Sequence, residues 1–335
     1  MMHPGHTQRL VDLLHSAMSQ LVPLLEDPAV LHISVSHTGA VWAERFGQGA
    51  QPTGMTMTPA QTEQVIRLVA SQGGHVVTGD QSRLATVLPS GERFQGFVPP
   101  TVRHPAFEIR KRPAQVYPLE AYVEADIVTE AQAVRLRYAV QARENIVVAG
   151  GTGSGKSTLL NAFLHELRSY TGHVVTLEDV PELQVAAPYY LALYTVPGQT
   201  TLTDLVRDSL RCNPARVIVG EVRGGECLDV LDVWNTGHPG GMLSIHADPG
   251  KALRRLESLI RRAPLTVPLP QEELRELIAD AVDVIVDIER VEGAPGRRVT
   301  GVTACHGIDE RGRYVLELLE QHTACPTPEV TVWAK

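Results

Sequence analysis

The sequence predicts a two-domain α/β protein, in which a smaller α+β domain precedes a larger domain built on a mostly parallel sheet. Three observations support this prediction. The chain has 335 residues, enough for about two domains. In its second part, apolar strand-like runs alternate with helical patterns, as in parallel α/β sheets. A glycine-rich loop at 150–155 joins one such run to a helical pattern. We therefore expect an N-terminal domain over 1–112, a linker over 113–125 and the second domain over 126–335.

The first domain is expected to combine two helices with short strands. Helical periodicity predicts a helix from Gln8 to Leu25. A second helix is predicted to begin after Thr58, where Pro59 and Gln61 complete a capping-box pattern, and to end near Gly73. The expected strands lie at 32–36, 40–45, 84–88, 93–98 and 107–112. The third and fourth of these runs flank Pro-Ser-Gly, which is typical of a hairpin.

The segment Gly-Gly-Thr-Gly-Ser-Gly-Lys-Ser at 150–157 matches the phosphate-binding loop pattern at every required position. Residues 145–149 are expected to form a buried strand that enters the loop, and a helix is expected after it. This arrangement directs several backbone N–H groups and a helix N-terminus at one anion. The second domain is therefore predicted to have the RecA-like P-loop NTPase fold.

Within this loop each residue type has an expected task. Lys156 is expected to contact the β- and γ-phosphates of ATP, and the Ser157 hydroxyl to join the shell of Mg²⁺. Glycine lets the backbone approach phosphates without a Cβ in the way. The other residues expected to bind nucleotide are Gly151, Thr152, Gly153, Ser154, Gly155 and Thr158.

Polar residues end three further strand-like runs of the second domain. Glu178 and Asp179 follow the run at 173–177, Glu221 follows Val217–Gly220, and His246 follows 242–245. In open parallel sheets, ligands bind beyond the carboxyl ends of the strands. We therefore expect these residues to converge with the glycine loop on one crevice.

These residues have expected roles and simpler alternatives. Glu221 is expected to orient or polarise the attacking water, directly or through Mg²⁺, and Glu178 to be a second catalytic or metal-binding acid. Acids at strand ends are also common as solvated residues or helix caps. His246 is expected to donate a hydrogen bond near the γ-phosphate, whereas for His238 a packed or surface position is equally expected.

A basic cluster of Arg103, Arg110, Lys111 and Arg112 precedes the linker. An arginine that neutralises charge on a transferring phosphoryl group is worth about 10³–10⁵ in rate. We expect Arg110 to act in catalysis and Arg112 to bind nucleotide, so that the first domain closes over ATP. Arg223, near Glu221, is a further candidate for this chemistry. The alternative is a solvated basic strand end.

Composition limits the classes of partner. The formal net charge of −8 argues against nucleic-acid binding driven by the charge of the whole surface, but it does not exclude a local basic groove. We find neither an apolar run long enough to cross a bilayer nor a secretory signal. The four cysteines lie far apart, a pattern typical of free thiols in a reducing compartment. We therefore expect a cytoplasmic protein.

Together these segments resemble the secretion traffic ATPases of type II and type IV secretion, most closely their conjugal-transfer branch. The resemblance rests on the glycine loop and on four further stretches, which lie at 176–183, 211–224, 236–241 and 244–248. It implies an ATP-hydrolysing motor, a homohexameric ring and an N-terminal domain that hinges on nucleotide binding. It also implies attachment to the cytoplasmic face of a bacterial inner membrane, beside other components of the machine.

The resemblance leaves other functions open. A pilus or type II secretion motor would use the same chemistry with different partners, although the chain lacks the tetracysteine insertion common in type II relatives. A nucleotide-gated assembly scaffold would bind ATP with little turnover. Direct DNA translocation is disfavoured by the net charge.

Overall fold

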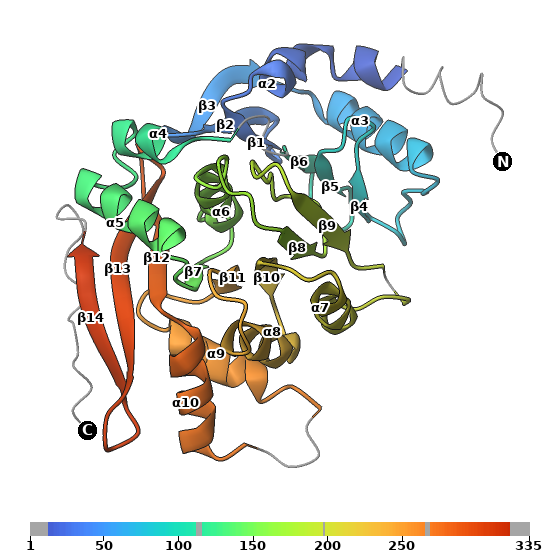
Figure 1. Cartoon of the computed structure of the whole chain (residues 1–335). Coiled ribbons are helices and arrows are strands. Elements are labelled where there is room, and N and C mark those ends of the chain that lie inside the picture. The colour runs from blue at the N-terminus through green and yellow to red at the C-terminus, as the bar shows by residue number, and fades with distance from the viewer. Residues whose placement is uncertain (1–12, 112–115, 197, 265–268, 322–335) are drawn as a thin grey trace. The chain divides into compact units, whose positions relative to one another are not determined.

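The computed structural model describes residues 13–111, 116–196, 198–264 and 269–321 (Figure 1). The chain forms two compact units. The first contains the chain up to residue 115 together with 293–296, and the second contains the remainder. Within the described ranges, no helix combines the length and the apolar character needed to cross a bilayer.

The first unit is built on a six-stranded antiparallel sheet with the order β3-β2-β1-β6-β5-β4. Its strands are β1 (Val30–Val35), β2 (Ala40–Arg45), β3 (Gly49–Thr56), β4 (Arg83–Val87), β5 (Arg93–Phe97) and β6 (Ala106–Arg110). Helix α3 (Pro59–Gln72) turns Val65, Ile66 and Val69 into the core. Its predicted start is confirmed, because Thr58 and Gln61 form the capping box. The predicted hairpin is β4–β5.

One local expectation for this unit was wrong, and one strand was missed. The single helix expected up to Leu25 is interrupted: residues 13–17 are helical, Met18 is a turn, and η1 (Ser19–Leu21) and α2 (Val22–Glu26) follow. Pro23 has no N–H to continue an earlier helix, and it occupies the first turn of α2 instead. Strand β3 was not predicted, because Pro52 and two glycines conceal it. It is an edge strand, where proline is tolerated.

The second unit is built on an eight-stranded sheet with the order β14-β13-β12-β7-β11-β10-β8-β9. Its strands are β7 (Ile146–Gly150), β8 (Val174–Glu178), β9 (Tyr190–Tyr194), β10 (Arg216–Val222), β11 (Met242–His246), β12 (Val284–Arg290), β13 (Arg297–Ile308) and β14 (Tyr314–Gln321). The run from β12 to β9 is parallel, and β13 and β14 add an antiparallel hairpin. The predicted fold class, a mostly parallel sheet with flanking helices, is confirmed.

Helices cover both faces of this sheet (Figure 1). They are α4 (Leu119–Glu124), α5 (Glu130–Gln141), α6 (Lys156–His165), α7 (Leu202–Arg211), α8 (Glu226–Asn235), α9 (Ala252–Ile260) and α10 (Gln271–Ala281). Val147 and Ala149 of β7 join one core with α7 to α10, while the alternate residues Ile146 and Val148 face the other side. Helix α4 lies in the stretch expected as a linker, and its Tyr122 is fully buried.

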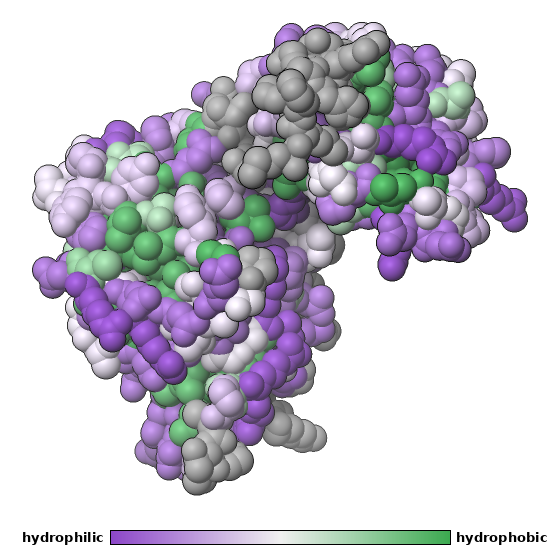
Figure 2. Space-filling model, turned by 90° about the vertical axis from the view of Figure 1, so that its right-hand side faces the viewer, coloured by the Kyte–Doolittle hydropathy of each residue, from purple (hydrophilic) through white to green (hydrophobic). Residues whose placement is uncertain are grey.

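On the face drawn in Figure 2, apolar residues form small clusters among hydrophilic ones.

In the second unit, β7, β11, β10 and β8 lie next to one another. Ala149 of β7 faces Ile245 of β11, and Gly150 faces His246. Because these strands are parallel, their carboxyl ends meet at one edge of the sheet.

Candidate functional site

The loop between β7 and α6 has a backbone shape that depends on glycine. Gly153 and Gly155 have φ values of +70° and +101°, which side chains other than glycine rarely allow. A Cβ at Gly150 would lie 2.2 Å from the carbonyl oxygen of Ile288. Helix α6 begins with Gly155 as its N-cap and has no side-chain cap. Its first N–H groups are therefore available to an anion, and Ser157 lies in that first turn.

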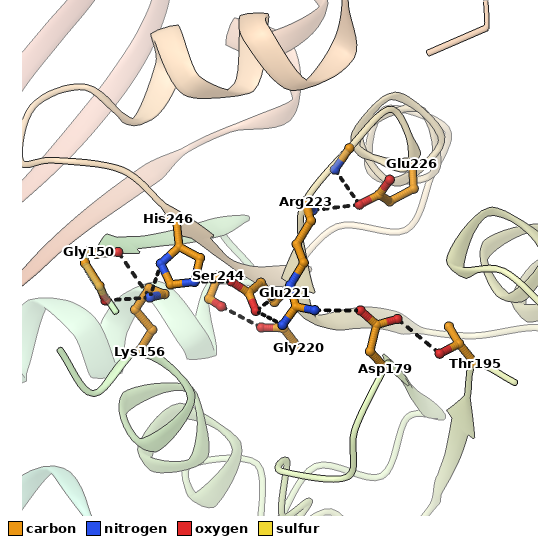
Figure 3. Close-up of polar contacts among 12 residues, drawn as sticks. Gly150, Lys156, Asp179, Thr195, Gly220, Glu221, Arg223, Glu226, Ser244 and His246 are labelled. Atoms are coloured by element: carbon orange, nitrogen blue, oxygen red, sulfur yellow. Dashed lines mark hydrogen bonds and ion pairs between the residues drawn. The ribbon is translucent and has the colours of Figure 1, made fainter. Parts of the chain in front are cut away.

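Lys156 lies back over the loop that precedes it (Figure 3). Its Nζ donates to the carbonyl oxygens of Gly150, at 3.1 Å, and Gly151, at 2.8 Å. The same nitrogen lies 3.2 Å from Nδ1 of His246. These contacts hold the ammonium group at the carboxyl ends of β7 and β11.

Glu221 continues this series of contacts. Its Oε1 lies 2.7 Å from Nε2 of His246, and its Oε2 accepts hydrogen bonds from Nε and Nη2 of Arg223, at 3.0 and 2.6 Å. Arg223 also reaches Asp179, which accepts from Thr195 (Figure 3). Side chains from four strands or their ends therefore form one connected network.

The tautomer of His246 follows from its neighbours. Because an ammonium group can only donate, we assign Nδ1 as the acceptor from Lys156 and the ring proton to Nε2, facing Glu221. The pKa of His246 is lowered, first by burial and then by the charge of Lys156, although Glu221 opposes this shift. A neutral imidazole thus connects a cation to a carboxylate.

A bulge places Glu221 at this edge. The pairing of β10 with β11 changes register between Val219 and Val222, which displaces Gly220 and Glu221 from the regular ladder. The hydroxyl of Ser244 donates to the carbonyl oxygen of Gly220 at 2.6 Å and stabilises the bulge. This supporting role of Ser244 was not predicted, because no local sequence motif indicates it.

Glu178 is the most buried acid of the site, with 3% of its surface exposed. Its Oε1 accepts two backbone hydrogen bonds, from Glu182 and Leu183, at 2.8 Å each. Its Oε2 is buried and has no hydrogen-bond partner among the described residues. Burial raises the pKa of Glu178, and the two backbone bonds only partly offset this effect.

The donor set fits a hard divalent cation. Mg²⁺ prefers oxygen ligands, usually one or two carboxylates with substrate phosphates and water. The unpaired Oε2 of Glu178 and the hydroxyl of Ser157 in the first turn of α6 are groups of this kind. A bound cation would also offset the cost of ionising Glu178.

Other predicted residues lie elsewhere. His238 precedes β11, whereas His246 ends it, so the two histidines lie at opposite ends of this strand. The Nδ1 of His238 contacts the carbonyl oxygen of Val233 at 3.2 Å. His238 therefore matches the expectation of a packed residue and not that of a residue near the phosphates.

The basic cluster of the first unit is less uniform than its sequence suggests. Arg103 and Arg110 are exposed, but Lys111 is buried, and its Nζ donates to the carbonyl oxygens of Leu24 and Asp27. Lys111 therefore stabilises this unit from inside. Arg112 lies outside the described residues.

Strand β12 carries residues that the sequence analysis missed. It lies beside β7, with Asp287 facing Ala149, so its carboxyl end adjoins the glycine loop. Asp287 is 6% exposed and accepts from the backbone N–H of Gly250. The run Val-Ile-Val-Asp-Ile-Glu-Arg at 284–290 is an apolar strand that ends in polar residues. It is the same signal that identified Glu221 and His246.

Comparisons with known proteins agree with this architecture. The family model described as "Type II/IV secretion system protein" matches residues 83–326. Conjugal transfer protein TrbB of Rhizobium radiobacter is 41% identical over 309 residues, covering 91% of this chain and 92% of that protein. PtlH, a type IV secretion system protein of Bordetella pertussis, is 33% identical over 312 residues, covering 84% of this chain and 91% of the relative.

Among solved structures, the ATPase DotB of Legionella pneumophila has a TM-score of 0.56 at 17% identity. The match covers 95% of this chain and 80% of that one. At this identity the likeness concerns the fold alone.

Proposed function

We propose that this chain, which belongs to the type II/IV secretion ATPase family, binds ATP at the glycine loop and hydrolyses it to drive a conjugative or type IV secretion machine. One observation supports the chemistry most strongly. Lys156, His246, Glu221 and Arg223 form a continuous series of contacts from the loop to the end of β10. A phosphate-binding cation is thereby connected to the acid expected to act on water.

Binding would redistribute these contacts. The γ-phosphate competes with the carbonyl oxygens of Gly150 and Gly151 for the ammonium group of Lys156. When Nζ turns to the phosphates, Nδ1 of His246 loses its donor, and the orientation of the imidazole changes at Glu221. Glu221 then orients the attacking water, and Arg223 holds this carboxylate in place by its two hydrogen bonds.

Mg²⁺ would be held by Ser157 and Glu178, with Glu221 near its shell. When bound, the cation neutralises charge that develops on the phosphates. Thr152, Ser154 and Thr158, together with the loop glycines, would position the phosphate chain through backbone N–H groups.

The same proposal covers the movement of the first unit and the assembly in which the chain acts. Arg110 and Arg112 of the first unit would clamp the nucleotide, and loss of the γ-phosphate would release that clamp. The chain would assemble as a homohexameric ring on the cytoplasmic face of the bacterial inner membrane, where it meets other secretion components. The support for these points is the family membership and the relatives named for conjugal transfer and type IV secretion.

Phosphate release by the purified protein tests this proposal. We expect ATP turnover in the unaltered protein and a loss of at least about a hundredfold in Lys156→Ala, because the phosphates lose their main cation. Lys251→Ala is the control, since its side chain is 62% exposed and forms a surface ion pair with Asp248. Tight ATP binding without turnover in the unaltered protein would favour a nucleotide-gated scaffold. Absence of both binding and turnover would refute the proposal.

A further inference from the structure

The hairpin formed by β12 and β13 runs alongside the glycine loop. A methyl group at Gly150 would meet the carbonyl oxygen of Ile288, and one at Gly153 would lie 3.4 Å from Nη1 of Arg290. One at Gly155 would lie 2.6 Å from Nη1 of Arg297. Successive positions of the loop therefore adjoin successive positions of this hairpin, and two guanidinium groups lie next to its glycines.

The two arginines face each other across the hairpin. Arg290 and Arg297 are directly paired in the register of β12 with β13. Lys156 and the positive N-terminus of α6 add to the positive charge beside the same loop. An anion bound at the loop would be attracted by all of these groups.

Their burial separates the roles of the two arginines. Arg297 is 4% exposed, and its guanidinium lies beside Gly155, whose φ of +101° favours glycine. It is therefore able to hold the last turn of the loop in its left-handed conformation. Arg290 is exposed and lies beside Gly153, in the middle of the loop. Its planar group presents the paired donors that suit phosphate oxygens.

We propose that Arg290 is a phosphate ligand of the bound nucleotide, supplied by the same chain and the same unit as the glycine loop, and that Arg297 is a positioning residue for Gly155. The inference rests on the proposed nucleotide site. Arg290 would be a cation at the end of strand β12 of the second unit, in addition to the arginines of the N-terminal unit. Because the loop backbone cradles the α- and β-phosphates, Arg290 contributes to binding of ADP as well as ATP.

Equilibrium binding of fluorescent ADP and ATP analogues to the full-length protein tests this role. Arg290→Ala should raise the Kd of both nucleotides about tenfold or more, as expected for loss of a charge-assisted hydrogen bond. Arg290→Met keeps the apolar stem without the charge and should lose affinity equally, whereas Arg290→Lys should retain part of it. Arg311→Ala removes an exposed arginine at the opposite end of β13 and should bind like the unaltered protein.

Pyrophosphate competition identifies the part of the nucleotide that Arg290 contacts. If Arg290 holds phosphate, Arg290→Ala should weaken pyrophosphate binding by a similar factor. Unchanged affinity in Arg290→Ala, full affinity in Arg290→Met, or a pyrophosphate affinity that does not change would each overturn the inference. Nucleotide binding by the unaltered protein and its loss in Lys156→Ala report on the proposed site separately. A failure of Arg290 alone therefore leaves that site standing.

Discussion

The two ends of strand β11 carry many polar groups but pair them differently. At the amino end, Arg216 donates to the backbone carbonyl oxygens of Gly240 and Val140, and Asn145 accepts from the N–H groups of Gly240 and Gly241. At the carboxyl end, His246 contacts the side chains of Lys156 and Glu221. The side chains named at the amino end bond to backbone, whereas at the carboxyl end His246 links two side chains to each other.

This difference separates stability from function. Removing a side chain from buried backbone groups that it bonds leaves those groups unpaired, which carries a large penalty. Side chains bonded to each other at the rim of a sheet are able to exchange partners when a ligand arrives. We therefore expect substitutions at the amino end to act on unfolding, and those at the carboxyl end to act on turnover.

The largest effect is expected from Arg216→Ala. Arg216 is 1% exposed, stacks over the ring of Tyr170 at 4.5 Å and bonds two buried carbonyl oxygens. Losing these buried hydrogen bonds together with the ring contact should cost about 3 kcal/mol or more of unfolding free energy, measured by denaturant unfolding. Arg211→Ala is the control, since its side chain is 80% exposed. Equal stability of the two variants would contradict the assignment of the amino end to stability.

Asp287→Asn is expected to have a smaller effect that depends on pH. Burial raises the pKa of Asp287 to about 7. Between about pH 4 and 7, the unfolded chain has released this proton and the folded chain still holds it, so the free energy of unfolding falls as pH rises. Asparagine does not ionise, and its oxygen still accepts from Gly250.

Thermal unfolding of both proteins at pH 5 and pH 8 measures this effect. As the pH rises from 5 to 8, the free energy of unfolding of Asp287→Asn should increase by on the order of a few kcal/mol relative to that of the unaltered protein. A difference between the two proteins that does not vary with pH would show that the carboxyl group titrates normally. The pKa of Asp287 would then be that of an ordinary solvated acid.

The smallest effects are expected at His246 and His238. His246→Ala should lower kcat about tenfold with little change in ATP affinity, because its role is to connect Lys156 with Glu221. His238→Ala should leave kcat within about twofold, since His238 contacts the backbone of Val233 and lies at the other end of β11 from His246. Steady-state kinetics of both variants measures the contrast. Equal losses in kcat would contradict it.

Local signals predicted much of the larger unit. The strand, glycine loop and helix around Lys156 were predicted, as were the runs that end at Glu178, Glu221 and His246, because a buried parallel strand produces an uninterrupted apolar run. The adjacency of β7, β11, β10 and β8 confirms that these ends share one edge of the sheet.

The remaining features depend on distant pairing. Arg290 lies more than a hundred residues from the loop, and only the neighbouring position of β12 and β7 brings them together. Ser244 supports the bulge at Gly220 through a single hydroxyl, and periodicity says nothing about such a contact. Lys111 was grouped with surface arginines by its neighbours in sequence, but the alternation of strand β6 turns it inward.

Turnover by Glu221→Gln, with ATP affinity determined on the same preparation, tests the central claim most directly. The claim is that the carboxyl ends of the parallel strands act together on one bound nucleotide. It predicts ATP affinity close to that of the unaltered protein and phosphate release lowered by about a hundredfold or more. Phosphate release at the unaltered rate would contradict the claim.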